Sequence, residues 1–441
     1  MIAIEMLILL STILPLFHLL NALFGRRRKM KPVISPERRI SILVPCFNEE
    51  DTVRTSISGL LRSDYNNFDA IYINDGSFDS TMQQLDDMLN LCPLPDAPGV
   101  TAAYRSAKYE NFYVLNQQNG GKSAALNAGI AFAGSDIVVT LDADSVLQRD
   151  ALKIISHAFD DENVAAAGGA IHIMQGYAPR SVFRRLGRTR AVIVALQMLE
   201  YLKGFYIYKL SLAKQNATAI ISGAFGAFRK QALLDAGGFR RTLGEDIDIT
   251  ISIQKHIHRT KKKILYLPEA LCCTQCPENW DDLKKQRIRW QKGFIDCAVH
   301  HRRFLLRTVL FKSLSFHFVV EALAVGHLSC LFTLVTLTLM PLLALTEPAS
   351  LQTFLLYYAI CTGLSLVSAL AALAVSVRYH RYPGHVWGWL LAAMLLDIVF
   401  YRYFTLLMYL GGTVSYFWSR RSAQIWGRVA RSRQPYYAPH T

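Results

Sequence analysis

Two acidic pairs carry the side chains best suited to chemistry. Asp142 and Asp144 flank Ala143 directly after the apolar run Ile137–Leu141. Alternate residues of an extended segment point the same way, so both carboxylates can reach one divalent cation. Hard oxygen ligands suit Mg²⁺ or Mn²⁺, which also bind phosphate oxygens. An Asp-x-Asp pair is equally common in solvated turns, and its meaning depends on the residues around it.

Glu245 and Asp246 form the second pair, in a turn that precedes a helical run from Ile247. A carboxylate whose pKa is set by its neighbours can accept a proton from an attacking hydroxyl. The alternative is a capping role, because acids in the first turn of a helix offset its partial positive charge. These two residues alone leave both roles open.

Three further polar residues follow expected strands. Asp75 ends the run from Ala70, and Asn48 and Glu49 close the run from Ile40. Carboxylates at such positions bind the ribose or base of a nucleotide in other α/β folds. Each of them also suits a helix N-terminus, so nucleotide binding and capping both remain open.

A glycine pair and a lysine open an amphipathic helix at Gly120, Gly121 and Lys122. Backbone amides and an ammonium group at a helix N-terminus favour an anion such as a diphosphate. The phosphate-binding loop G-x-x-x-x-G-K-[ST] requires a glycine at 116, where this chain has Asn116. The sequence therefore argues against that class of nucleotide triphosphatase.

Gln286, Arg289 and Trp290 form a charged and aromatic cluster before the C-terminal apolar region. An indole face stacks on a sugar ring, while Gln and Arg hold hydroxyls and phosphate. Trp and Arg also anchor helices at a membrane interface, and the two roles are compatible.

The elements that must position these residues belong to an α/β fold. Between about 38 and 300, apolar β-branched runs alternate with amphipathic stretches, which predicts a mainly parallel sheet covered on both faces. Strands are expected at Ile40–Val44, Ala70–Ile73, Phe112–Leu115 and Ile137–Leu141. Catalytic groups gather at the carboxyl ends of such strands, where the acids fall. The segment 91–108 is expected to be a surface loop.

Apolar runs flank this domain. We expect an anchor at 1–25, a catalytic domain at 38–305, a membrane region at 312–418 and a basic tail at 419–441, with spans near 316–345, 353–376 and 386–411. Basic residues after the anchor and around Arg378 place both on the cytoplasmic side. Counting crossings puts the tail outside, but its arginines favour the inside, so the topology stays open. Glu321, His327 and Asp397 interrupt the apolar runs, and they either line a polymer path or pair between helices.

Composition supports a membrane protein. The chain has 441 residues, 52% hydrophobic, and a formal net charge of +15. Its basic residues cluster beside apolar stretches, which argues for membrane flanks and against nucleic-acid binding. Eight cysteines without a repeated spacing argue against a disulfide framework and for a reducing compartment.

Taken in order, these clusters resemble the processive family 2 glycosyltransferases, which include hyaluronan, chitin, cellulose and poly-N-acetylglucosamine synthases, and most closely the last of these. The resemblance implies a GT-A-like, Rossmann-like domain that uses a UDP-sugar and Mg²⁺ or Mn²⁺. It assigns nucleotide-sugar binding to Asn48, Glu49, Asp75, Gly120, Gly121, Lys122 and Asp142, the metal to Asp142 and Asp144, the base to Asp246 beside Glu245, and acceptor or diphosphate binding to Gln286, Arg289, Trp290 and Gly223.

The implied activity is an inverting transfer of GlcNAc or Glc to a growing polysaccharide at the plasma or inner membrane, with the catalytic domain in the cytoplasm. The implied partners are the UDP-sugar, a glycan or lipid-linked acceptor, the bilayer, and export or accessory proteins. Two alternatives stay open: a single addition to a lipid carrier, and a nucleotide-sensing transporter or receptor.

Overall fold

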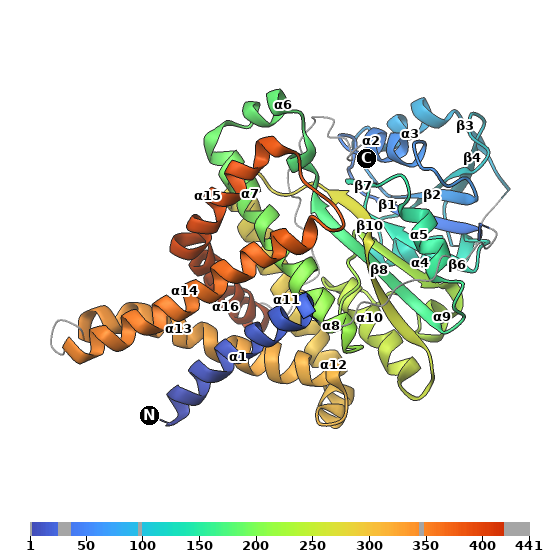
Figure 1. Cartoon of the computed structure of the whole chain (residues 1–441). Coiled ribbons are helices and arrows are strands. Elements are labelled where there is room, and N and C mark those ends of the chain that lie inside the picture. The colour runs from blue at the N-terminus through green and yellow to red at the C-terminus, as the bar shows by residue number, and fades with distance from the viewer. Residues whose placement is uncertain (1, 25–36, 96–98, 344–347, 419–441) are drawn as a thin grey trace. The chain divides into compact units, whose positions relative to one another are not determined.

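The computed structural model describes residues 2–24, 37–95, 99–343 and 348–418 (Figure 1). The chain divides into two compact units, which we describe separately. Of the described residues, 37–194 and Thr218–Lys285 belong to the sheet unit, and 2–24, Ala195–Ala217 and 286–418 belong to the helical unit. The segment Ala195–Ala217 thus lies within the range 38–305 expected for the catalytic domain, whose bounds stay a prediction.

The sheet unit is built on a ten-stranded sheet in the order β3-β4-β5-β2-β1-β6-β9-β8-β10-β7. Its strands are β1 Ile40–Cys46, β2 Phe68–Asp75, β3 Leu91–Pro93, β4 Ala102–Ser106, β5 Phe112–Gln117, β6 Ile137–Leu141, β7 Ser145–Leu147, β8 Val164–Ile173, β9 Phe225–Arg229 and β10 Lys263–Thr274.

Strand direction makes the sheet mixed but mostly parallel. The central neighbours β5, β2, β1 and β6 are parallel, and β8 is parallel to β10. Only β4, β7 and β9, among the described strands, run against the rest, so seven of the ten point one way. The predicted α/β class with a parallel centre is confirmed.

Helices cover both faces because the central strands are apolar on both sides. The strands β2 and β6 are buried along their whole length. Leu43, Ile73 and Val138 from the sheet join Leu126 and Ile249 from the helices in one core. The helices of this unit are α2 Val53–Leu60, α3 Thr81–Leu89, α4 Lys122–Phe132, α5 Ala151–Ala158, α6 Arg180–Arg185, α9 Lys230–Asp235 and α10 Glu245–His256.

The expectation of a loop at 91–108 is wrong. Leu91–Pro93 pairs antiparallel with Ala102–Ser106, which continues the sheet beyond β5. Pro95 and Gly99 belong to the connection between these two short strands, whereas Pro93 ends β3, the edge strand. Pro93 is compatible with an edge strand, where a missing N–H group leaves no ladder bond unmade inside the sheet.

The helical unit contains the apolar helices. Its elements are α1 Ile2–Phe24, the π-helical segment η2 Gly204–Lys209, α8 Leu210–Lys214, α12 Ser313–Ser315, the π-helical segment η4 Phe316–Val325, α13 Gly326–Leu343, α14 Pro348–Ser376, α15 Trp387–Leu396, the π-helical segment η6 Asp397–Tyr401 and α16 Arg402–Trp418. Figure 1 shows α13 and α14 side by side, in accord with their contacts. Two long helices, α7 Gly187–Lys203 and α11 Trp280–Thr308, have residues in both units.

Within the described part of the chain, four helical stretches are long and apolar enough to cross a membrane: Gly187–Lys214, Ser313–Leu334, Tyr358–Ser376 and Gly384–Trp418. The last three overlap the expected spans, whereas Gly187–Lys214 was not expected. At the N-terminus, Thr12–Phe24 is a shorter apolar helix. The basic residues 26–29 and the tail 419–441 lie outside the described residues.

Polar side chains within these helices have partners in the same unit. The Nζ atom of Lys203 lies 2.6 Å from a carboxylate oxygen of Asp397. The Nε2 atom of His327 lies 3.0 Å from the hydroxyl of Thr413. Such contacts are what pairing between helices predicts, since an unpaired charge in an apolar environment is costly.

Candidate active site

Lys122 is the centre of a charged cluster in the sheet unit. It is the first residue of α4, and its Nζ atom lies 2.7 Å from Oδ1 of Asp142 and 2.9 Å from Oε1 of Glu245. Asp142 follows β6, and Glu245 begins α10. Three segments that are distant in sequence therefore converge on one ammonium group.

Asp246 lines a small pocket together with Lys122 and Glu245. Its two carboxylate oxygens accept hydrogen bonds from the backbone N–H groups of Gly223, at 3.1 Å, and Ile247, at 2.8 Å. The lining of this small pocket includes Lys122, Glu245, Asp246 and Gly223. A β-carbon at Gly223 would lie 3.0 Å from Nζ of Lys122. Only a residue without a side chain leaves this ammonium group undisturbed.

The charges of the cluster affect the protonation of Lys122 and of Asp246 differently. Burial alone would lower the pKa of Lys122, but attraction to Asp142 and Glu245 outweighs it and holds the pKa well above its usual value. Burial raises the pKa of Asp246 to about 6, and repulsion from Glu245 adds to this effect. Lys122 and the two backbone N–H groups oppose the rise. The arrangement thus combines a firmly charged lysine with a carboxylate that titrates near neutral pH.

Asp75 orders the glycine turn before α4. It is buried at the end of β2, and its oxygens accept the N–H groups of Gly120, at 2.9 Å, and Gly121, at 2.8 Å. The side-chain amide of Gln117 donates to the same carboxylate at 2.6 Å. Gly121 has φ +85° and ψ 166°, a conformation essentially restricted to glycine. The predicted nucleotide residues Asp75, Gly120 and Gly121 are therefore brought together.

Asn48 and Glu49 contact the loop that follows β2. The Oδ1 atom of Asn48 accepts the N–H group of Phe78, and the N–H group of Glu49 donates to the hydroxyl of Thr81. The carboxylate of Glu49 also accepts a hydrogen bond from Thr52 at 2.7 Å. These bonds join the ends of β1 and β2, and a role in nucleotide binding stays a prediction for both residues.

Asp144 has a different environment from Asp142. It is 5% exposed, and its Oδ1 atom accepts hydrogen bonds of 3.2 Å from the hydroxyls of Ser145 and Thr274. The side chain of Asp142 is 33% exposed. The carboxylates of the expected metal pair thus start from one turn, one held by hydroxyls and the other by an ammonium group.

The cluster of Gln286, Arg289 and Trp290 lies on α11 in the helical unit. Gln286 accepts a hydrogen bond of 2.6 Å from Arg287, whose guanidinium lies 4.2 Å from the ring of Trp290. Arg287 is in turn paired with Glu200 at 2.7 Å. Whether these residues share a site with the acids of the sheet unit stays a prediction.

Sequence reasoning missed the side chains that hold the acids in place. Gln117 is the register partner of Asp75 on the neighbouring strand, so the expected strand ends could have identified it. Thr274 offers no such signal, because β10 was not predicted. Arg287 lies inside the noted Gln-x-x-Arg-Trp cluster, but its contact with Trp290 depends on the helical spacing of α11.

Comparison with known proteins places the chain in a glycosyltransferase family. The family model described as "Glycosyltransferase like family 2" matches residues 36–293. The chain is 29% identical over 256 residues to a poly-beta-1,6-N-acetyl-D-glucosamine synthase of Staphylococcus aureus, covering 58% of this chain and 54% of the relative. The corresponding synthase of Staphylococcus epidermidis is 30% identical over 272 residues, covering 61% and 58%. The match thus spans little more than half the length of these relatives.

The fold has a counterpart among solved structures. A mannosyltransferase from Pyrobaculum calidifontis, in complex with GDP-Man and Mn²⁺, aligns with a TM-score of 0.57 and 17% identity over 95% of this chain and 99% of that one. This likeness concerns the fold, and it agrees with the predicted GT-A-like domain. Since the family model covers more than half of the sequence, the resemblance found from the motifs is confirmed: the chain belongs to the glycosyltransferase-like family 2.

Proposed function

We propose that the chain is a membrane-bound, inverting glycosyltransferase that moves a sugar from a UDP-sugar to a growing polysaccharide. The family and the two staphylococcal synthases support the reaction class, and they favour GlcNAc as the sugar. The observation that carries the proposal is the cluster in which Lys122 pairs with Asp142 and Glu245, while Lys122, Glu245 and Asp246 line one pocket.

Asp246 is the proposed general base. It takes the proton of an acceptor hydroxyl while the hydroxyl oxygen bonds to the anomeric carbon and the bond from that carbon to the diphosphate breaks. A carboxylate whose pKa is about 6 is ionised at neutral pH and is still basic enough to assist. Lys122 stabilises the negative charge on the departing UDP.

Asp142 and Asp144 are the proposed holders of Mg²⁺ or Mn²⁺. Three carboxylates, Asp142, Glu245 and Asp246, interact with the single positive charge of Lys122. This excess of negative charge, on hard oxygen donors, fits a divalent cation. Such a cation supplies Lewis-acid stabilisation of the diphosphate.

The membrane helices suggest the place of the reaction. We infer a multi-pass protein of the plasma or inner membrane, with the sheet unit in the cytoplasm, where nucleotide sugars are available. Four candidate spans support this, together with basic flanks in the sequence. The glycan or lipid-linked acceptor and any export or accessory protein belong to the same proposal.

The test uses purified full-length protein in nanodiscs with Mg²⁺ or Mn²⁺. Labelled UDP-GlcNAc, UDP-Glc and GDP-Man are supplied separately, and products are sized by gel electrophoresis or mass spectrometry. We expect metal-dependent polymer from a UDP-sugar. Single-sugar products on lipid would establish the lipid-carrier alternative instead, and nucleotide binding without any transfer would support a sensor and refute the enzyme.

A further inference from the structure

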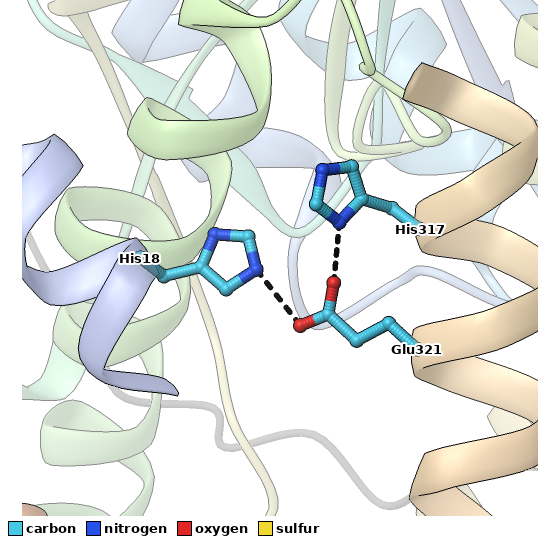
Figure 2. A group of neighbouring side chains, drawn as sticks. All are labelled: His18, His317 and Glu321. Atoms are coloured by element: carbon cyan, nitrogen blue, oxygen red, sulfur yellow. Dashed lines mark hydrogen bonds and ion pairs between the residues drawn. The ribbon is translucent and has the colours of Figure 1, made fainter. Parts of the chain in front are cut away.

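A second cluster of possible metal ligands lies in the helical unit. His18 comes from α1, whereas His317 and Glu321 come from η4, four residues apart. The Nε2 atom of His18 lies 2.8 Å from one carboxylate oxygen of Glu321, and Nδ1 of His317 lies 2.5 Å from the other. Figure 2 shows the carboxylate between the two rings, with one oxygen directed at each. All three side chains are buried.

The surroundings of this cluster are apolar. His317 and Glu321 belong to the candidate span Ser313–Leu334, and His18 belongs to the apolar helix Thr12–Phe24. The rings of Phe17 and Phe316 lie next to His317. Ionisable groups within apolar spans are costly, so a cluster of three calls for a binding partner or a function.

The distal nitrogens of both imidazoles are already oriented. The Nδ1 atom of His18 lies 2.8 Å from the hydroxyl of Ser211, and Nε2 of His317 lies 3.0 Å from Oε1 of Gln215. The amide nitrogen of Gln215 donates to the backbone oxygen of Ser211, which leaves its Oε1 atom as an acceptor. His317 therefore carries a proton on Nε2. Imidazoles that ligate metals are held in this way, through the nitrogen that does not bind the ion.

The protonation of His317 determines what can bridge its ring and the carboxylate of Glu321. With its Nε2 atom protonated, a neutral His317 presents a lone pair at Nδ1 to the carboxylate of Glu321, and two acceptors then face each other. An additional proton between Nδ1 of His317 and the carboxylate relieves this contact at the distance observed. A divalent cation relieves it as well, because it accepts electron pairs from both imidazoles and from the carboxylate together.

We propose that His18, His317 and Glu321 form a site for a transition-metal ion of the Zn²⁺ class. Two imidazoles and one carboxylate suit Zn²⁺, in contrast to the all-oxygen acids of the candidate active site. Their ligand atoms all lie within 4.8 Å of one another. Zinc–ligand distances of about 2.0–2.2 Å require nitrogen–oxygen separations of roughly 3.3 Å. Side-chain rotations that move the ligand atoms by under about 1 Å would therefore make room for the ion.

Such a site ties the N-terminal helix to η4. The ligand from α1 is about three hundred positions away from the η4 pair in sequence, with |i−j| = 303 for His18 and Glu321. Metal binding in a folded chain stabilises that fold by the free energy of binding. Each bound ion also displaces at least one proton from the cluster, because metal-ligating imidazoles must offer a lone pair.

The test measures zinc in the full-length protein, purified in detergent with a histidine-free tag. The protein is stripped with a chelator, loaded with Zn²⁺ in excess Mg²⁺, desalted and assayed by inductively coupled plasma mass spectrometry. We expect one zinc per chain in the wild type and, for Glu321→Gln, an affinity lower by about tenfold or more. His327→Asn is the matched control, a histidine one element further along, and its zinc content should equal that of the wild type.

A second measurement does not depend on the folding of a variant. Wild-type protein loaded with Co²⁺ should show the visible d–d absorption of a four-coordinate nitrogen and oxygen site, and Zn²⁺ should abolish it. Substoichiometric zinc in the wild type would overturn the proposal. Undiminished zinc in a well-folded Glu321→Gln variant would overturn it too, since the ion would then be bound elsewhere.

Discussion

The neighbours of Asp246 shift its pKa in opposite directions. Glu245 and burial raise its pKa, whereas Lys122 lowers it, with a net value of about 6. The carboxylate is therefore ionised at neutral pH but becomes protonated under mild acid.

Sugar transfer should decline as the pH falls through about 6, because protonated Asp246 cannot accept the acceptor's proton. The pKa is raised, so activity is present above this value and lost below it. The measurement is kcat/KM for the donor against pH, which reports the free enzyme. A rate that stays constant between about pH 5 and pH 8 would contradict the assignment.

Replacing Lys122 by Gln should move this acid limb to higher pH. The ammonium group lowers the pKa of Asp246, and its removal leaves Asp142, Glu245 and Asp246 to repel one another. Transfer should also slow by about 10²-fold or more, because a charge that stabilises the leaving diphosphate is lost.

The matched control is Lys255→Gln, which removes the same charge from the exposed end of α10. Its pH profile and rate should equal those of the wild type. An unshifted acid limb in Lys122→Gln would show that the lysine does not act on the base.

The positions of the acids at the ends of strands could be predicted from the sequence, but their contacts within the cluster could not. Asp75 and Asp142 follow runs whose type is evident from β-branched residues. The bond between Lys122 and Glu245, in contrast, joins positions more than a hundred residues apart and depends on how α4 and α10 pack. Such contacts are properties of tertiary structure, which local patterns do not encode.

At the scale of elements, the turn before α4 depends on Gly121. With φ +85° and ψ 166°, this residue directs its own N–H group and that of Gly120 at Asp75. The turn thereby fixes where α4 begins and where Lys122 points.

Gly121→Ala should destabilise the protein by about 1–3 kcal/mol and weaken UDP binding, because the required backbone conformation is strained for any residue with a β-carbon. Thermal unfolding and equilibrium dialysis measure the two effects. Gly134→Ala is the control, since a β-carbon there meets nothing within 4 Å. Equal stability and affinity in both variants would refute the role of the turn.

The central strands were predictable, and those at the other end of the sheet were not. The expected strand Ile137–Leu141 matches β6 to the residue, and Ile40–Val44 falls short of β1 by two residues. The missed strand β8 has the sequence VAAAGGAIHI, whose Ala and Gly residues have low β-propensity. It is stabilised as a strand by burial between β9 and β10, a tertiary effect.

On the scale of the whole molecule, the apolar helices were partly predictable. The three C-terminal spans follow from long apolar runs, whereas Gly187–Lys214 combines an apolar run with basic residues at both ends. It is the least apolar of the four candidate spans, which explains why it was not expected to cross a membrane.

The orientation is testable with thiol labelling in intact cells. Cys92 is exposed on the sheet unit, and Arg378 is exposed in the loop between two candidate spans. A membrane-impermeant maleimide should modify Cys92, and Arg378→Cys in a Cys92→Ser background, only after the cells are permeabilised. Labelling of either thiol in intact cells would place that segment outside.

The most direct test of the catalytic cluster is Asp246→Asn, with UDP binding and sugar transfer measured on one preparation. The amide preserves the shape of the side chain but cannot take a proton. We predict that transfer falls by about 10²–10⁴-fold while UDP affinity is unchanged. Turnover close to that of the wild type would contradict the account, because the reaction would then proceed without the base on which it depends.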